Sequence, residues 1–420
     1  MGAFETGAAE IESVVSGNTS QEHYWWQRQD LCYRDGALVF AGHQVERLAA
    51  RFGTPSFVYS IARIENNIQR IKSALDANGL SGRHRLLYAM KANRFAPLLT
   101  VLKQKGLCGI DACSPQEVEL ALSCGFASED ISFTAGSLSE NDVRMLARFD
   151  GLFMDCDSQH AIRTWGQIKP GSEIGIRINP AMGVSRAAND KLQYAGSVTT
   201  KFGIYRSEFA QALALAAEYD LKITKIHFHT GCGYLNEQLP QWEAVIRECL
   251  WFVDQAKDVR CVNVGGGLGV PHLATDQPLD LNAWAQVLKR QFGERTVQLE
   301  IEPGDYIVKD AGLLLLSKTF QERKNGVDFV GVDAGFNIAP EPAYYQLPFQ
   351  PLALRLNDEP MKKVNVVGNI NEALDVWYEK ASLPDLSEQR FLTLINAGGY
   401  SASMASNHCM RGQFKEFLIY

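Results

Sequence analysis

Short apolar runs alternate with amphipathic stretches along residues 55–304. The run SFVYS (56–60) predicts a strand, residues 61–79 predict an amphipathic helix that ends at Gly79, and HRLLYAMKAN (84–93) predicts the next strand. The same rhythm continues to about residue 305 and gives roughly eight or nine strand–helix units. This alternation predicts a parallel sheet, and the number of units favours a closed, TIM-like (β/α)8 barrel over an open sheet.

The pattern changes after Gly304, where strand-like runs follow one another with few helices between them. These runs are residues 311–323, 327–335, 350–356, 362–369 and 390–398. They predict a second, mainly β domain. We therefore predict an α/β protein organised as a leader (1–30), strands that join the β domain (31–54), the barrel (55–304) and the C-terminal β domain (305–420).

Composition and charge exclude several classes of function. The 420-residue chain has a net charge of −7 at pH 7 and a pI near 5.7, which argues against a broad basic surface for nucleic acid. No apolar stretch approaches the ~20 residues of a membrane span. The nine cysteines form no CxxC pair, and the N-terminus has no basic segment followed by an apolar run, so we expect a cytoplasmic protein with free thiols. We expect no metal site.

Polar residues follow several of the predicted barrel strands. They are Lys91, Asp111, Arg177, Asn179, His227, His229, Gly265, Gly266, Gly267 and Glu302. The carboxyl ends of the strands form the active-site face of such barrels, so we expect these residues to converge there. Each residue alone has an ordinary explanation, such as a solvated lysine, a glycine turn or a capping carboxylate.

Together, these residues match what pyridoxal 5'-phosphate (PLP) requires of a protein. The cofactor needs a lysine for its covalent link, a histidine against its ring, a backbone cradle for its phosphate and an acid at its pyridine nitrogen. We therefore predict PLP bound to Lys91. We expect His227 to face away from His229 and to serve packing only.

Eight ordered segments resemble the motifs of fold-type III PLP-dependent decarboxylases, in particular diaminopimelate decarboxylases and, more distantly, ornithine decarboxylases. The segments are YAMKAN (88–93), IDACSPQE (110–117), HFHTGCG (227–233), GGGLG (265–269), EIEPGD (300–305), DAGFN (333–337), NEALD (371–375) and AGGYSASMASN (397–407). The resemblance covers roughly residues 30–420. It implies an alanine racemase-like or ornithine decarboxylase-like barrel and β domain, and a head-to-tail homodimer with active sites at its interface.

The resemblance also implies roles for individual barrel residues. Lys91 would hold the cofactor covalently, His229 would stack on its ring, and Glu302 would pair with its pyridine nitrogen. Asp111 and Arg177 would lie close to the ring and the lysine.

Further contacts implied by the resemblance come from loops and from the other subunit. The phosphate would be held by Gly265, Gly266, Gly267, Cys232 and Tyr400. Asn371 and Glu372 would reach into the site of the partner subunit as catalytic residues. Cys232 replaces the usual serine, and because a thiol is a weaker donor we interpret it as an inert contact.

Two acidic residues depart from the pattern of diaminopimelate decarboxylases. Asp305 and Glu341 stand where that family carries arginines expected to grip the distal carboxylate of the substrate, while Tyr345 still matches. Two carboxylates would repel an anionic group. The exchange predicts a substrate with a cationic distal group near Asp305, Glu341, Glu372, Tyr345 and Tyr400. The alternative is that both acids face solvent or pair with a lysine or arginine of the protein itself.

Asn371 is a further departure, because it replaces the cysteine that donates a proton in the family. An amide cannot act as a general acid at neutral pH. Water, Lys91 and His408 remain candidates for this step.

The sequence therefore predicts PLP-dependent decarboxylation of a small amino acid that resembles lysine, ornithine or arginine, or of a carboxylated polyamine. Four alternatives remain: a decarboxylase of a larger intermediate such as a siderophore precursor or a carrier-bound amino acid, a meso-diaminopimelate decarboxylase, a PLP-dependent racemase, and a non-catalytic PLP-binding protein. The long β domain argues against the last two.

Overall fold

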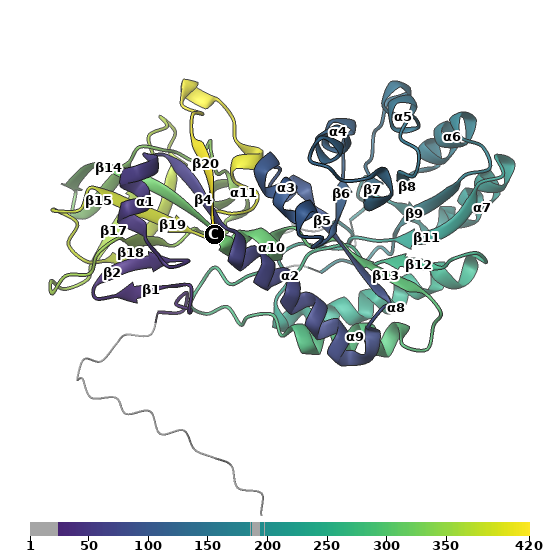
Figure 1. Cartoon of the computed structure of the whole chain (residues 1–420), viewed down its shortest axis with the longest axis horizontal. Coiled ribbons are helices and arrows are strands. Elements are labelled where there is room, and N and C mark those ends of the chain that lie inside the picture. The colour runs from purple at the N-terminus through teal and green to yellow at the C-terminus, as the bar shows by residue number, and fades with distance from the viewer. Residues whose placement is uncertain (1–23, 185, 187–193, 197) are drawn as a thin grey trace, which may run out of the picture.

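The computed structural model describes residues 24–184, 186, 194–196 and 198–420. A barrel with its surrounding helices lies on one side of the molecule, and a β domain lies on the other (Figure 1). Most of the predicted leader, residues 1–23, falls outside the described residues. Within the described ranges, no helix is long and apolar enough to cross a membrane.

Eight parallel strands close into a barrel. In spatial order from β9 they are β9 (Glu173–Asn179), β11 (Lys222–His227), β12 (Cys261–Asn263), β13 (Gln298–Ile301), β5 (His84–Ala89), β6 (Gly109–Ala112), β7 (Ile131–Thr134) and β8 (Phe153–Cys156). The pairing of β8 with β9 closes the ring. The two-residue β10 (Ile204–Tyr205) pairs in parallel with the last two residues of β9. The predicted (β/α)8 barrel is confirmed.

Helices cover the outside of the barrel. They are α2 (Ile61–Leu75), α3 (Ala96–Gln104), α4 (Pro115–Ser123), α5 (Glu140–Leu146), α6 (Gln159–Ile168), α7 (Phe209–Glu218), α8 (Leu239–Gln255) and α9 (Leu281–Phe292). Several start at a side-chain cap: Ser60, Ser114 and Ser158 each accept a hydrogen bond from a backbone N–H in the first turn. Capped starts close to the strand ends keep the strand–helix loops short.

The β domain is an eight-stranded sheet. It comprises β14 (Gly312–Lys324), β15 (Val327–Val332), β16 (Pro351–Ala353), β17 (Lys362–Val367), β18 (Val376–Leu383), β19 (Phe391–Ile395), β20 (Lys415–Ile419) and β4 (Ser56–Ser60). The strand β4 corrects the prediction that SFVYS belongs to the barrel, because it pairs with β14 and β20 instead. All five of its residues are buried, and a short buried strand has the same apolar pattern in either sheet.

The segment before β4 packs on this β domain. The strands β1 (Leu31–Arg34), β2 (Ala37–Phe40) and β3 (His43–Gln44) form a small sheet, followed by α1 (Val45–Phe52). The N–H of Leu38 donates to the carbonyl of Leu354 at 2.9 Å. Trp26 is buried in the apolar cluster that includes side chains of β1, β2 and α1.

The long strand β14 contributes to two cores at once. Leu314 and Leu316 pack in the larger core that includes the barrel, whereas Leu313 and Leu315 pack against the sheet of β1 and β2. Because successive side chains of a strand point to opposite faces, burial on both faces explains the unbroken leucine run.

Replacing Leu314 by Ala should lower the free energy of unfolding by about 2–5 kcal/mol, because a fully buried leucine leaves a cavity when it is shortened. Val327 lies in the same sheet but is 43% exposed, so Val327→Ala is the matched control and should change stability by less than about 0.5 kcal/mol. Thermal unfolding of both variants measures the difference. Equal shifts would contradict the two-core position of β14.

Candidate active site

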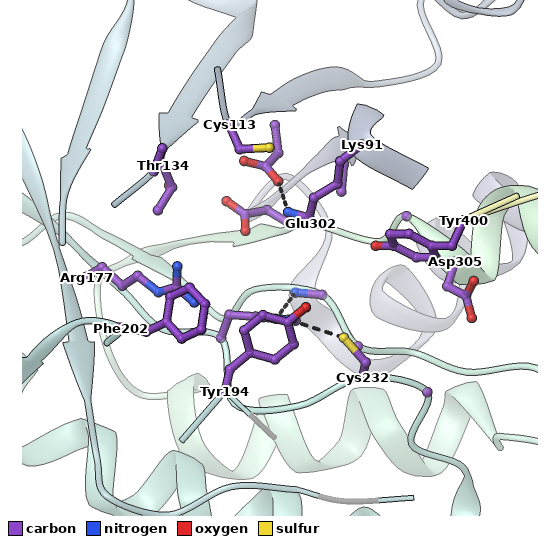
Figure 2. Close-up of a pocket in the computed structure, with 18 of the residues that line it drawn as sticks. Lys91, Cys113, Thr134, Arg177, Tyr194, Phe202, Cys232, Glu302, Asp305 and Tyr400 are labelled. Carbon is purple, nitrogen blue, oxygen red and sulfur yellow. Dashed lines mark hydrogen bonds and ion pairs between the residues drawn. The ribbon is translucent and has the colours of Figure 1, made fainter. Parts of the chain in front are cut away.

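A cavity of about 330 Å³ lies at the carboxyl ends of the barrel strands (Figure 2). The predicted residues that line it are Lys91, Asp111, Arg177, His227, His229, Cys232, Gly266, Gly267, Glu302, Asp305, Glu341, Tyr345 and Tyr400. Residues that the sequence analysis did not single out also line it, among them Cys113, Thr134, Tyr194 and Phe202. Cys113 lies within the segment 110–117 and Thr134 ends β7, so their positions carried a signal, whereas no motif distinguishes Tyr194 and Phe202 from ordinary loop residues.

Lys91 lies in the tight turn Met90–Ala92 that follows β5. Its Nζ atom is 3.1 Å from Asp111 Oδ2, and 39% of its side chain is exposed, on the cavity side. Burial disfavours the charged amine, but the carboxylates of Asp111 and Glu302 more than offset this and hold the pKa of Lys91 above its usual value. The second oxygen of Asp111, Oδ1, is buried without a hydrogen-bond partner in the described part of the chain.

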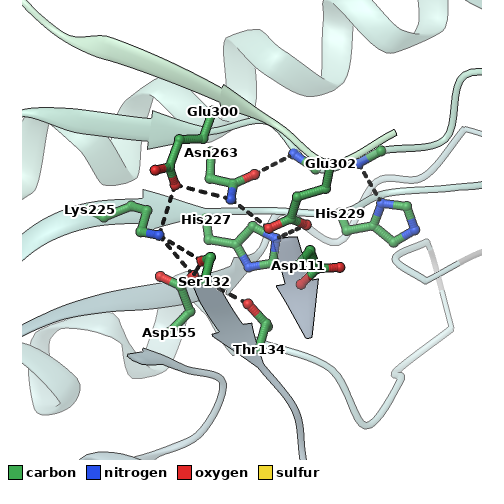
Figure 3. A network of polar contacts seen from close by, with 12 residues as sticks. Asp111, Ser132, Thr134, Asp155, Lys225, His227, His229, Asn263, Glu300 and Glu302 are labelled. Carbon is green, nitrogen blue, oxygen red and sulfur yellow. Dashed lines mark hydrogen bonds and ion pairs between the residues drawn. The ribbon is translucent and has the colours of Figure 1, made fainter. Parts of the chain in front are cut away.

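Glu302 follows β13 and lies in a buried polar network (Figure 3). Its Oε1 atom accepts a hydrogen bond of 2.6 Å from Asn263 Nδ2, and its Oε2 atom is 3.1 Å from His227 Nε2. Burial raises the pKa of Glu302, while the cations of Lys91 and Lys225 oppose that rise. The carboxylate is therefore fixed in orientation before any ligand binds.

The position of His227 corrects the prediction that it serves packing on a face opposite to His229. Residues two apart in a strand point to the same side, and both His227 and His229 line the cavity. Burial lowers the pKa of His227 to about 3, so its ring is neutral and can donate Nε2–H to Glu302. The i, i+2 spacing was the signal that could have found this contact.

Lys225 lies one inward position earlier on β11, deeper in the barrel. Its Nζ atom is 2.8 Å from Glu300 Oε2, 3.1 Å from Asp155 Oδ2 and 3.0 Å from Ser132 Oγ (Figure 3). Asn263 Nδ2 is 3.5 Å from the same Glu300 oxygen. This buried cluster therefore connects to Glu302 through the Asn263 amide.

His229 is held by backbone and sulfur contacts. The N–H of Gly266 donates to Nδ1 at 3.3 Å, and Nε2 lies 3.6 Å from Cys232 Sγ. Burial, followed by the charges of Arg177 and Lys91, lowers the pKa of His229 well below its usual value. The ring is therefore neutral, and its contacts assign the proton to Nε2.

Arg177 lies near the carboxyl end of β9, on the far side of the cavity from Asp305 (Figure 2). It is buried, and its guanidinium lies 4.7 Å from the centre of the Phe202 ring. Burial lowers its pKa, with Asp157 and Glu302 acting against that change. Arg177 is predicted to lie close to Lys91. The two residues line the same cavity but are not in direct contact.

The glycine run leaves no room for side chains. A Cβ atom on Gly266 would lie 2.2 Å from the carbonyl oxygen of Glu302, and one on Gly267 would lie 2.3 Å from that of Gly231. Gly265 and Gly267 also have positive φ angles of 70° and 100°. The N–H groups of Gly265 and Gly266 already donate to Asn263 Oδ1 and His229 Nδ1. Only the Gly267 N–H of the run lacks an acceptor within the described residues.

The acidic residues at the other end of the cavity are paired through a lysine. Lys309 Nζ is 3.1 Å from Asp305 Oδ1, forms an ion pair with Glu341, and donates to the carbonyl of Gly399 at 2.9 Å. Pairing with a lysine of the protein, the alternative left open by the sequence, is therefore what the structure shows. The signal in the sequence was the i, i+4 spacing of Asp305 and Lys309.

Asn371 and Glu372 are not brought to this cavity within one chain. Both are exposed on a loop before β18, and Glu372 Oε1 is 3.4 Å from His408 Nε2. Their predicted entry into the site of a partner subunit stays a prediction.

The residues present fit PLP. A lysine faces the cavity beside an acid, a neutral imidazole lies at its wall, and a fixed carboxylate lies at its base. The glycine run presents bare backbone where a side chain would collide, which suits the close approach of a phosphate.

Comparison with known proteins agrees with this chemistry. The family described as "Pyridoxal-dependent decarboxylase, pyridoxal binding domain" matches residues 61–309. A diaminopimelate decarboxylase of Methanothermobacter thermautotrophicus is 32% identical over 91% of both chains, and one of Pseudomonas aeruginosa is 30% identical over 92% of both. These matches decide between the decarboxylase and racemase hypotheses in favour of the decarboxylase.

Solved structures share the fold. The diaminopimelate decarboxylase of M. jannaschii in complex with L-lysine superposes with a TM-score of 0.85 at 24% identity and covers 93% of both chains. The arginine decarboxylase of Paramecium bursaria Chlorella virus gives a TM-score of 0.77 at 19% identity, over 89% of this chain and 99% of that one.

Cys232 should react slowly with iodoacetamide near neutral pH, because burial raises the pKa of its thiol to about 11 and only the thiolate reacts. The rate should rise about tenfold per pH unit between pH 7 and 10. Peptide mapping by mass spectrometry measures it, with the exposed Cys409 as internal control. Modification of Cys232 as fast as Cys409 at pH 7 would show a reactive thiol.

Proposed function

The chain belongs to the family of pyridoxal-dependent decarboxylases, and on that premise we propose that it decarboxylates an amino acid with a cationic distal group. It is a carboxy-lyase that uses PLP, and its substrate is an amino acid. The observation that supports the cationic group is the acidic wall formed by Asp305 and Glu341. Both residues line the cavity, whereas the lysine between them is 0% exposed. A distal carboxylate would meet two acids and no accessible cation at this wall.

Lys91 and Glu302 have the central roles in this proposal. When bound, PLP supplies an electron sink for the bonding pair left as the α-carboxylate departs as CO2. Lys91 would hold the cofactor covalently, and its position beside Asp111 at the cavity leaves room for the substrate amine to take its place. Glu302, fixed by Asn263 and His227, holds a proton at the pyridine nitrogen, which maintains the electron demand of the ring.

The remaining wall residues orient the reacting groups. His229 would lie against the cofactor ring, and because its imidazole is neutral it would add no positive charge there. Asp111 stabilises the charged form of Lys91 until the amine is exchanged. The Gly267 N–H and the Tyr400 side chain would hold the phosphate, and Arg177 would lie near the ring.

We propose a homodimer in which the loop of Asn371 and Glu372 completes the site of the partner. The loop is exposed in one chain, and Leu374 beside it is 47% exposed. Because Asn371 cannot release a proton, reprotonation of the α-carbon falls to Lys91, His408 or water.

A second candidate is the decarboxylation of meso-diaminopimelate. It is favoured by the relatives of 30–32% identity that are named diaminopimelate decarboxylases. The distal end of meso-diaminopimelate carries an amine as well as a carboxylate, so the acidic wall could pair with the amine while repelling the carboxylate.

Replacing Lys91 by Ala should abolish CO2 release and remove the absorbance band of covalently bound PLP. The physical reason is that no other lysine among the described residues lines the cavity. Spectra of the purified variant measure the band. Lys103→Ala, at a partly exposed lysine on α3, is the control and should keep both properties. A persistent covalent band in Lys91→Ala would place the cofactor elsewhere.

A substrate panel tests the cationic distal group. Lysine, ornithine, arginine and carboxynorspermidine are compared with meso-diaminopimelate, with CO2 release as readout. At least one of the four cationic compounds should show a kcat/KM at least about tenfold above that of meso-diaminopimelate, since like charges in a partly desolvated site cost several kcal/mol. Robust turnover of meso-diaminopimelate alone would overturn the proposal.

A further inference from the structure

Lys309 lies behind the cavity wall that Asp305 and Glu341 form. Asp305 begins the short helix α10 (Asp305–Val308), Lys309 follows that helix, and Glu341 begins α11 (Glu341–Tyr345). The ammonium group donates to Glu341 and to the carbonyl of Gly399, and it lies 3.1 Å from Asp305 Oδ1 as an ion pair. Since Lys309 is completely buried behind the two acids, a substrate does not reach its ammonium group.

The carboxylates keep acceptor capacity toward the cavity. Lys309 pairs with Glu341 Oε2 and lies 3.1 Å from Asp305 Oδ1, and Asp305 Oδ1 accepts no hydrogen bond from the described residues. Asp305 is 15% exposed at its side chain and lines the cavity. A donor on a ligand can therefore reach this wall.

Other charged groups near the wall are balanced. Arg186 forms an ion pair with Asp276 and donates to the carbonyl of Val270 at 2.9 Å. His272 is neutral, because burial and the charges of Lys309 and Arg186 hold its pKa well below its usual value. What remains is a group of two acids and one ammonium, which carries one net negative charge when both acids are ionised.

We infer that Lys309 is a specificity-determining residue that sets the net charge of this wall to minus one, so that the site selects an amino acid with a single positive charge at its far end. The inference rests on the proposed function and adds to it a count of charges. Without Lys309 the same two acids would carry a charge of minus two, and with either acid neutralised the wall would carry none. Lys309 acts through the acids rather than by touching the ligand.

The pKa of Glu341 makes this count depend on the ligand, because a carboxyl with a pKa near neutrality is fully ionised only when a cation is beside it. Burial raises its pKa to about 7, Lys309 opposes the rise, and Asp305 adds to it. Two carboxylates thus compete for one lysine, and an arriving cation would stabilise the second negative charge.

The test uses a suppressor pair in the PLP-loaded enzyme. Glu341→Gln leaves Asp305 and Lys309 and gives a neutral wall, whereas Lys309→Met combined with Glu341→Gln leaves Asp305 alone and returns the charge to minus one. Methionine suits the vacated space because the Lys309 ammonium lies 5.6 Å and 5.5 Å from the centres of the Phe349 and Tyr400 rings.

The readout is the affinity ratio between racemic lysine and its uncharged isostere, racemic 2-aminoheptanoate. Each affinity is measured from the change in cofactor absorbance on binding. We expect Glu341→Gln to lower the ratio at least about tenfold, and the double variant to recover most of that loss. A lysine with a merely structural role would make the double variant worse than the single one.

A second pair exchanges the roles of the two acids. Asp305→Asn should lower the affinity ratio, and Asp305→Asn combined with Lys309→Met, which leaves Glu341 alone, should recover it. Cofactor content and thermal unfolding identify variants that fail to fold, and either pair suffices for the test. If wild type prefers lysine but neither double variant recovers the ratio, the charge count is overturned and the proposed function stands. If wild type itself shows no preference for lysine, the charge count is overturned as well, and the substrate panel decides separately on the proposed function.

Discussion

Closure of the parallel barrel, through the pairing of β8 with β9, is the constraint on which the position of every site residue depends. In a closed ring of parallel strands all carboxyl ends lie on one rim. Lys91, Asp111, Arg177, His229 and Glu302 come from parts of the chain up to about two hundred residues apart, and the ring brings them around one cavity. The helices outside contribute by keeping the connections short.

Two buried lysines show how this protein places charge in its interior. Lys225 inside the barrel and Lys309 behind the cavity wall each contact two acids and a further oxygen. A buried ammonium is costly unless all its donors are satisfied, so these clusters fix the directions of their acids. The hydrogen bonds around Lys225 continue through Asn263 to Glu302. The ion pairs of Lys309 fix the two acids at the far end of the cavity.

Much of the fold and of the cofactor end of the site could be predicted from the sequence, because strand ends and their order along the chain carry that information. The strand β4 could not be assigned, since five buried residues look alike in a barrel and in a sheet. The predicted face of His227 is wrong, because two residues that are two positions apart in a strand, like His227 and His229, point to the same face.

The pairing of the acids at the distal wall could be found only from the structure. Asp305 and Glu341 are visible as departures, but their shared partner depends on how α10 and α11 pack together. The absence of Asn371 and Glu372 from the cavity of one chain likewise follows from where their loop lies, which no local pattern encodes.

The strand β4 has a consequence for how the chain matures. It precedes the barrel, yet it lies between β14 and β20, the last strand. The β domain is therefore discontinuous: its sheet encloses a strand from before the barrel and ends with residues 415–419. Until those last residues emerge from the ribosome, β4 has an open edge able to pair with other strands. Contacts between such distant segments form late, since closing a long loop costs entropy before the contacts compensate for it. The barrel is thus inserted between two parts of one sheet, and that sheet is complete only when the strand before the barrel pairs with strands that follow it.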